Sequence, residues 1–214
     1  MSLKINEIFY SIQGESLYAG RPCIFIRLSG CNLRCTYCDT RYAWDEGVMM
    51  DLREVTKSIQ RFDCRLVEIT GGEPLIQEAT PSLAAELIHA GYTVLMETNG
   101  SIDIRPLPAD CIKIMDIKCP SSNEAEKNFL GNIPFLGIND QVKFVISDSR
   151  DYSFACTIVK NHCRNLPGGN ILFSVNTAVL NPQELAAWIL KDGLDVRLHM
   201  QLHKILWPEI ERGV

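Results

Sequence analysis

The chain alternates short apolar runs rich in β-branched residues with longer segments whose apolar residues recur at helical spacing. Repeated strand–helix units with short connections predict a parallel sheet with right-handed crossovers. The predicted strands span residues 23–28, 66–70, 93–97, 112–117, 142–146, 171–175 and 196–200. The predicted helices span residues 51–62, 80–90, 124–132, 151–163 and 182–191.

The length of the chain limits the architecture of this sheet. A closed barrel of eight strand–helix units takes about 250 residues, whereas this chain has 214. We therefore predict a partial, open β/α barrel of about six units, with a doubly wound sheet as the alternative. No repeat or linker divides the chain, so we predict a single domain over residues 1–214. In both architectures ligands bind at the carboxyl ends of the strands.

Charge and hydropathy exclude several classes of protein. The chain carries 21 basic and 26 acidic residues, a net charge of −5, and no basic patch of the kind that holds nucleic acid. No apolar run approaches the ~20 residues that cross a bilayer, and no signal peptide opens the chain. The nine cysteines are an odd number and cannot all pair. We expect a soluble cytoplasmic protein that acts on small molecules, with no nucleic-acid or membrane partner.

Three of the cysteines lie within eight residues, on the loop 29–40 that follows the first predicted strand: Cys31, Cys35 and Cys38. Clustered thiolates select zinc, copper(I) or iron–sulfur clusters. A closed structural zinc site needs four ligands, and the chain has no second pair of closely spaced cysteines. Three thiolates on a 4Fe–4S cluster leave one iron open for chemistry, so the spacing favours a reactive cluster over zinc or core thiols.

A second motif lies after the next predicted strand. The segment Gly71-Gly72-Glu73-Pro74 follows residues 66–70, and glycines there let the backbone approach a ligand closely. Together with the cysteine spacing and Tyr37 before the third cysteine, the chain resembles the radical S-adenosylmethionine (SAM) superfamily. In that superfamily the Gly-Gly-Glu-Pro segment lies along the methionine moiety of SAM.

The resemblance narrows to one family, the 7-carboxy-7-deazaguanine synthases, and extends through nearly the whole chain. The matching segments are Phe9–Ser16, Gly20–Cys23, Ile26–Asn32, Cys38–Thr40, Asp116–Pro120 and Gln201–Lys204. The resemblance implies a lyase that converts 6-carboxy-5,6,7,8-tetrahydropterin to 7-carboxy-7-deazaguanine with loss of ammonia, on the pathway to 7-deazapurines and queuosine. It implies a 4Fe–4S cluster that cleaves SAM reductively, a radical that removes hydrogen from the pterin, and assistance by Mg²⁺. A homodimer and a flavodoxin- or ferredoxin-type electron donor are further implications.

The motif match also assigns residues to these ligands. The substrate would contact Ile12, Gln13, Gly14, Glu15, Arg27, Thr70, His203 and Val214. SAM would contact Tyr37, Cys38, Asp39, Gly72, Glu73, Lys118 and Ser174. Cys31, Cys35 and Cys38 would hold the cluster, and Thr40 would reach the magnesium ion. The tail 201–214 would lie near the pocket. No catalytic side chain is predicted, because the cofactor performs the hard chemistry.

Several of these residues have an alternative role that does not involve a ligand. A strand arginine such as Arg27 more often forms a surface ion pair, but its place four residues before Cys31 favours binding of the substrate carboxylate. Glu15 either accepts N–H donors of the pterin or forms an ion pair. Thr40 offers a neutral oxygen, so Mg²⁺ would need the substrate and water as further ligands.

Two other functions remain open at the level of sequence. A glycyl-radical-activating enzyme shares the cysteine motif and acts on a partner protein, but gives no reason for the segment 11–15 or for Arg27. A zinc-binding interaction module would use the same thiols without redox chemistry.

Overall fold

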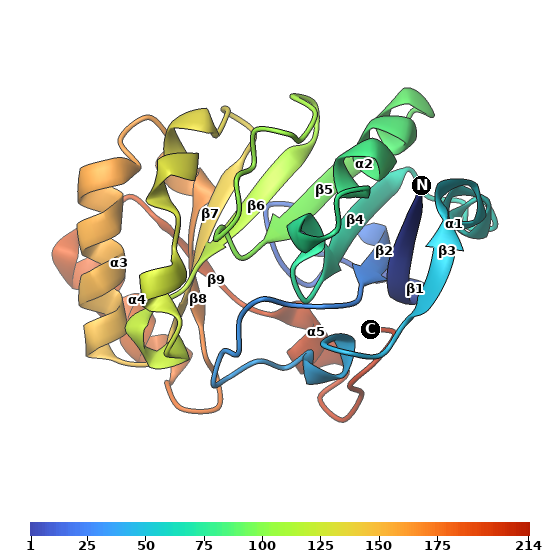
Figure 1. The fold of residues 1–214 in the computed structure, drawn as a ribbon. Helices are drawn as coiled ribbons and strands as arrows, with labels where there is room; N and C mark the ends of the chain where they lie inside the picture. Colours follow the sequence, from blue (N-terminus) through green and yellow to red (C-terminus); the bar gives the residue numbers. More distant parts are fainter.

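In the computed structural model, which describes residues 1–214, nine strands form a single open sheet (Figure 1). Its order is β3-β1-β2-β4-β5-β6-β7-β8-β9. β1 pairs antiparallel with β2 and β3, and all neighbouring pairs from β2 to β9 are parallel. The strands are β1 (Ser2–Ile12), β2 (Pro22–Leu28), β3 (Val48–Asp51), β4 (Leu66–Gly71), β5 (Thr93–Thr98), β6 (Ile112–Ile117), β7 (Gln141–Ile146), β8 (Ile171–Val175) and β9 (Arg197–His199).

Four helices connect the strands and pack on one face of the sheet, and a fifth lies near the C-terminus. They are α1 (Leu52–Ile59), α2 (Thr80–His89), α3 (Ser149–His162), α4 (Pro182–Asp192) and α5 (Leu202–Leu206). Local sequence sets their ends. Asp51 and Glu54 form a reciprocal capping box at the start of α1, and Asn181 caps α4 before Gly193 ends it in the left-handed region.

The main core lies between the helices and this face of the sheet. One cluster packs β2, β4 and β5 against α1 and α2, through residues such as Ile26, Ile69 and Val55. A second cluster packs β7 and β8 against α3 and α4, with Phe144 and Phe173 at its centre. Burial of these side chains supplies the main driving force for this arrangement.

The other face of the sheet carries a small apolar cluster and, beyond it, polar side chains. Phe25, Leu95 and Ile114 belong to the apolar cluster. In the register of the sheet, Phe25 pairs with Glu68 and Arg27 with Thr70. Because side chains alternate along a strand, these polar residues share a face, and they lie toward the carboxyl ends of the strands.

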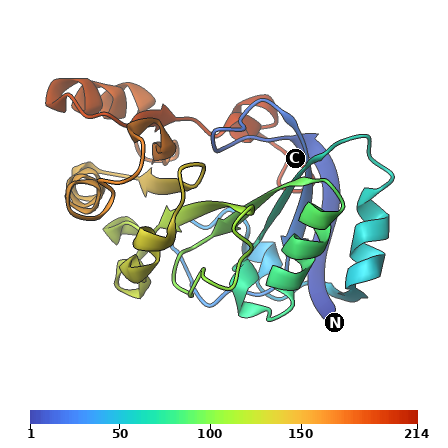
Figure 2. The same cartoon turned by 90° about the horizontal axis from the view of Figure 1, so that it is seen from above.

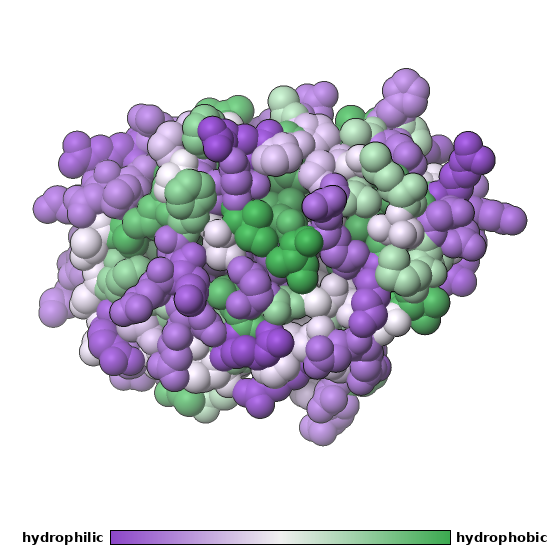
Figure 3. All heavy atoms as spheres, in the orientation of Figure 1, coloured by the Kyte–Doolittle hydropathy of each residue, from purple (hydrophilic) through white to green (hydrophobic).

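Seen from above, α5 lies beside the loop that follows β1, on the side of the molecule away from α1 and α2 (Figure 2). A hydrogen bond from the Leu202 amide to the Gly14 carbonyl (2.9 Å) joins the two segments. The outer surface mixes charged and apolar side chains, and on the face of Figure 3 the apolar ones gather near the centre. No helix is long and apolar enough to cross a membrane.

The predicted open, mostly parallel sheet is confirmed. All seven predicted strands are present, and four of the five predicted helices form. The predicted helix over 124–132 is wrong, because the segment forms two short 3-10 helices, Ala125–Lys127 and Leu130–Phe135. The chain leaves helical geometry at Asn128 (ψ 126°) and Phe129 (ψ 81°), where the Asn128 side chain hydrogen-bonds to the backbone of Lys118. The prediction also missed β1, β3 and α5.

Candidate active site

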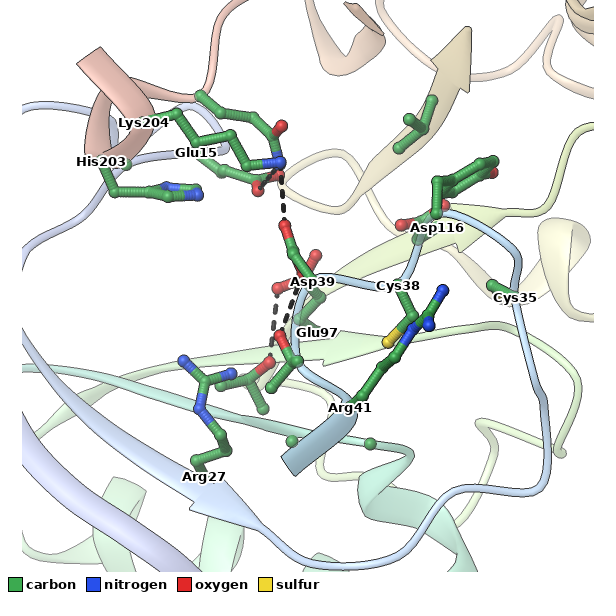
Figure 4. A pocket seen from close by; sticks show the side chains of 18 of the residues that line it. Glu15, Arg27, Cys35, Cys38, Asp39, Arg41, Glu97, Asp116, His203 and Lys204 are labelled. Atoms are coloured by element: carbon green, nitrogen blue, oxygen red, sulfur yellow. Dashed lines mark hydrogen bonds and ion pairs between the residues drawn. The ribbon is translucent and has the colours of Figure 1, made fainter. Parts of the chain in front are cut away.

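A cavity of about 830 Å³ opens at the carboxyl ends of the strands. Three segments far apart in the sequence enclose it: the loop after β1, the cysteine loop after β2, and the C-terminal segment from Gln201 to Val214. Figure 4 shows Arg27 entering the cavity on the side opposite His203 and Lys204, with the Cys38 sulfur on a third side. The parallel sheet therefore brings the predicted motifs together in one place.

All three clustered cysteines line this cavity as free thiols. Burial raises the pKa of Cys35 to about 11 and also raises that of Cys31, so a metal would have to displace their protons. No three His, Cys, Asp or Glu side chains converge as they would on a single ion. In a 4Fe–4S cluster each thiolate binds a different iron, so separated sulfurs on one loop are the donor set that such a cluster requires.

The cysteine loop packs directly against the Gly-Gly-Glu-Pro segment. The Glu73 amide donates to the Gly30 carbonyl (2.8 Å). A Cβ at Gly72 would lie 2.6 Å from the Cβ of Cys31 and closer still to the carbonyl oxygen of Gly30. Only glycine permits this approach, which also leaves Gly72 on the cavity wall.

Glu73 itself points away from the cavity and ties two strand ends together. Its buried carboxylate accepts hydrogen bonds from the amides of Leu75 (3.0 Å) and Asn99 (2.6 Å) and from the Thr98 hydroxyl (2.8 Å). Burial nevertheless raises its pKa. Glu73 is not among the lining residues, so its position suits support of the loop rather than direct contact with a ligand.

Two buried polar atoms on the cysteine side of the cavity lack any partner in the protein. They are the Tyr37 hydroxyl and Oδ1 of Asp116, and both residues line the cavity. Lys118 also lines it and forms an ion pair with Asp116 (3.0 Å). Because buried polar groups are normally paired, these atoms fit a site built to receive a polar ligand such as SAM.

On the other side of the cavity, the C-terminal segment holds the loop after β1. His203 packs against Gly14, where a Cβ would lie 3.0 Å from the His203 amide nitrogen and closer still to its ring. The Gln201 amide group donates to Glu15 (2.7 Å). Gln13, on the same loop after β1, donates a hydrogen bond to the carboxyl group of Glu68 on β4. Ile12 and Val214 complete this wall.

Glu15 belongs to an acidic cluster around Lys143 that the sequence reasoning missed. Lys143 forms ion pairs with Glu15 (2.7 Å), with Asp116 (3.3 Å) and with Glu97. Burial disfavours the charge of Glu15, but Lys143 outweighs this and lowers its pKa below the ordinary value. Burial and the neighbouring Glu97 raise the pKa of Glu68 well above the ordinary value, so the neutral form of this cavity-lining acid is favoured. The only sequence signal was a charged residue inside each apolar strand.

Arg27 lines the same cavity and forms the ion pair that is the ordinary role of a strand arginine. Its Nε donates to Glu7 (2.7 Å), and its guanidinium lies over the rings of Phe9 and Tyr42. The two terminal nitrogens have no hydrogen-bond partner within the protein. The ion pair with Glu7 therefore orients Arg27 and leaves its outer edge free for an anion.

Of the remaining predicted residues, Thr70 and Thr40 line the cavity and Ser174 does not. Thr70 lines it and donates weakly to Glu97 (3.4 Å). Thr40 also lines it and donates to Asp39 (3.0 Å), which is paired with Lys204 (2.9 Å). Ser174 is fully buried 3.4 Å from Nδ1 of His199 and is not among the lining residues.

The open sheet and the three-cysteine loop define a protein of the radical SAM class. The family model described as the radical SAM superfamily matches residues 25–115. The fold is similar to the crystal structure of QueE from Escherichia coli, with a TM-score of 0.79 at 22% identity over 94% of each chain.

Relatives of known name give a narrower family. The 7-carboxy-7-deazaguanine synthase of Koribacter versatilis is 41% identical over 99% of this chain and 100% of its own length. That of Chlorobaculum tepidum is 41% identical over 99% of this chain and 97% of its own length. That of Clostridium acetobutylicum is 34% identical over the full length of both. The chain belongs to the 7-carboxy-7-deazaguanine synthase family.

Proposed function

We propose that this chain converts 6-carboxy-5,6,7,8-tetrahydropterin to 7-carboxy-7-deazaguanine with loss of ammonia, as a step toward 7-deazapurines and queuosine. The observation that carries the proposal is the set of polar groups in the cavity, which is lined both by the free guanidinium edge of Arg27 and by the carboxyl groups of Glu15, Glu68 and Glu97. The substrate carries matching groups, with a carboxylate at one end and N–H donors of an aminopyrimidinone ring at the other.

Each end of the substrate matches a different set of side chains in the cavity. Arg27 binds the carboxylate through its two terminal nitrogens, a geometry that suits a bidentate pair. The N–H donors of the ring are assigned to Glu97 and Glu68, because a carboxylate accepts such donors and a protonated acid also donates. Gln13 and Thr70 line the same cavity. A bound pterin is therefore held in one orientation, with its ring toward Lys143.

The cofactor side is assigned to the cysteine loop. Cys31, Cys35 and Cys38 would hold a 4Fe–4S cluster, and Tyr37, Asp39, Gly72 and Lys118 would contact SAM. When bound, the cluster and SAM supply a carbon radical that abstracts hydrogen from the substrate. The chain's own part is to hold both ligands in one cavity and to exclude water, which the C-terminal segment does by covering the loop after β1.

Magnesium fits the same site only with help from the substrate. Thr40 supplies one neutral oxygen, and the neighbouring Asp39 is already paired with Lys204. Mg²⁺ prefers six oxygen ligands and keeps several waters. We therefore infer that the substrate carboxylate and water complete its shell beside Thr40.

We also propose the partners that the family resemblance implies. A flavodoxin- or ferredoxin-type electron donor would reduce the cluster, and two copies of the chain would form a homodimer in the cytoplasm. Glu73 and Ser174 keep supporting roles near SAM, since both are buried behind the wall of the cavity.

Anaerobic reconstitution tests the function directly. A brown protein with about four irons per chain that forms 7-carboxy-7-deazaguanine from the pterin, SAM and a reductant supports the proposal. Cleavage of SAM without the deazaguanine product would point to a glycyl-radical-activating enzyme instead. A colourless, zinc-loaded protein would point to an interaction module.

A further inference from the structure

Lys143 is the most heavily engaged charged side chain in the cavity. It extends from the middle of β7, its side chain is 4% exposed, and it touches carboxylates from three different segments. Glu15 comes from the loop after β1, Glu97 from β5 and Asp116 from β6. None of the family motifs in the sequence includes Lys143.

The ammonium group of Lys143 is surrounded by carboxylates. It donates hydrogen bonds to Glu15 (2.7 Å) and to Glu97, and it forms an ion pair with Asp116 (3.3 Å). Because these three partners enclose a side chain that is 4% exposed, we treat Lys143 as a positioning residue, which acts on bound ligands through the carboxylates it holds.

The three carboxylates around Lys143 differ in whether their second oxygen atom is free to accept a hydrogen bond from a ligand. The second oxygen of Glu15 already accepts from Gln201 (2.7 Å). The second oxygen of Glu97 has only the long contact with Thr70 (3.4 Å). Oδ1 of Asp116 is buried with no partner. Glu97 and Asp116 thus offer the free acceptors on the cavity wall.

These two acceptors belong to different halves of the cavity. Glu97 lies among the residues assigned to the pterin, beside Thr70 and Lys143. Asp116 lies beside Lys118, on the cysteine side assigned to SAM. Lys143 donates a hydrogen bond to Glu97 and forms an ion pair with Asp116 (3.3 Å). A ligand that fixes the ammonium at one of these carboxylates also fixes it for the other, and such a shared element is what couples two sites energetically.

We propose that Lys143 couples the binding of the pterin to the binding of SAM, by holding Glu97 for the N–H edge of one ligand and Asp116 for a donor group of the other. This inference rests on the proposed function, because it takes the pterin as the ligand at Glu97. Each ligand orders the lysine for its partner, so affinity for either one rises when the other is bound.

The test uses the anaerobically reconstituted holoenzyme without reductant, so that no turnover occurs. The dissociation constant of SAM is measured by titration calorimetry with and without saturating 6-carboxy-5,6,7,8-tetrahydropterin, and the converse titration checks reciprocity. In the wild type we expect the pterin to tighten SAM binding by about 5- to 150-fold, the usual range of such couplings. In Lys143→Met we expect the ratio to fall to about one.

Thermal unfolding and two further variants separate a loss of coupling from a loss of folding. Lys143→Met leaves three carboxylates facing one another, so its thermal unfolding is recorded first. Lys143→Arg keeps the charge but has a planar fork in place of a compact ammonium, and we expect it to retain part of the coupling. Asp116→Asn keeps Lys143 and removes its ion pair with Asp116, and we expect weaker SAM binding with no coupling.

Lys113→Met is the matched control. Lys113 is also a buried strand lysine with a buried carboxylate partner, Asp140 (3.3 Å), but it does not line the cavity. We expect it to lower stability and to leave the coupling ratio unchanged. Loss of coupling in this control as well would assign the effect to general destabilisation and overturn the proposal.

The remaining outcomes separate this inference from the proposed function. If the pterin binds but leaves the affinity for SAM unchanged in the wild type, or if Lys143→Met keeps the wild-type ratio, the role of Lys143 is refuted while the function stands. If the wild-type holoenzyme binds SAM but not the pterin, the proposed substrate is wrong and the coupling falls with it.

Discussion

Replacing Gly72 by alanine tests the packing of the two motifs against each other. The added Cβ would lie 2.6 Å from the Cβ of Cys31, whereas two carbon atoms prefer a separation of about 3.5–4.0 Å. The backbone must therefore move by about 1 Å. That movement stretches the hydrogen bond from the Glu73 amide to the Gly30 carbonyl, now 2.8 Å.

The cost follows from the size of this overlap. Overpacking a tight site costs about 1–3 kcal/mol, which in a chain of this size lowers the Tm by about 2–12 °C. We expect Gly72→Ala to lower the Tm of the apoprotein by this amount. Because Cys31 is one of the displaced residues, iron content after reconstitution and affinity for SAM should fall as well. Thermal unfolding, iron analysis and calorimetry measure the three effects.

Gly137→Ala is the matched control, since a Cβ there would meet nothing closer than 3.6 Å. It adds the same methyl group in a turn away from the cysteine loop and should keep both the Tm and the iron content. If Gly72→Ala behaves like Gly137→Ala in all three measurements, the close packing of the two motifs does not matter for the site and the reasoning fails.

Four other predictions follow from single contacts. Cys35→Ala should abolish cluster assembly, because two thiolates do not hold the cluster; retained iron would contradict the ligand assignment. Arg27→Ala should leave the iron content intact and raise the KM for the pterin by about 10- to 150-fold, whereas Arg105→Ala, at an exposed ion pair, should leave the KM unchanged. Glu68→Gln should raise the Tm at pH 8 but not at pH 4. The pKa of Glu68 is higher in the folded protein than in the unfolded chain, so Glu68 destabilises the fold increasingly as the pH rises above the pKa of the unfolded chain. An equal Tm difference at both pH values would show that the pKa of Glu68 is not raised in the folded protein. Asp51→Ala should cost about 1 kcal/mol of stability through loss of the α1 cap, measured by denaturant unfolding; an unchanged midpoint would show that the cap contributes nothing.

Most of the strands that the sequence predicted are buried on both faces, the edge strand β9 being the exception. Residues 142–146, for example, are buried throughout and are apolar apart from Lys143, because helices cover one side of the strand and the cavity lies on the other. β1 escaped prediction because it is mostly half-buried and mixes Lys4, Asn6 and Glu7 with apolar residues. Its place in the sheet depends on pairing with β2 and β3, which no local pattern reveals.

The sequence predicted the parts of the candidate site that belong to recognisable motifs. The cysteine loop, Gly72 and the loop after β1 carry distinctive sequences, and the structure gathers them around one cavity. Glu68, Glu97 and Lys143 carry no motif. Each is one charged residue in an apolar strand, and only the alignment of β4, β5 and β7 shows that they share a face. Register between strands is a tertiary property, so single-strand reasoning could not find this cluster.

The position of the two chain ends has a practical consequence for anyone who handles this protein. Val214 lines the cavity and Arg212 pairs with Glu46 (2.9 Å) beside it, whereas Met1 is 83% exposed at the far end of β1. An affinity tag or fluorescent fusion at the C-terminus would be threaded past the substrate entrance. The same tag at the N-terminus would project into solvent, so purification, immobilisation and labelling belong at Met1.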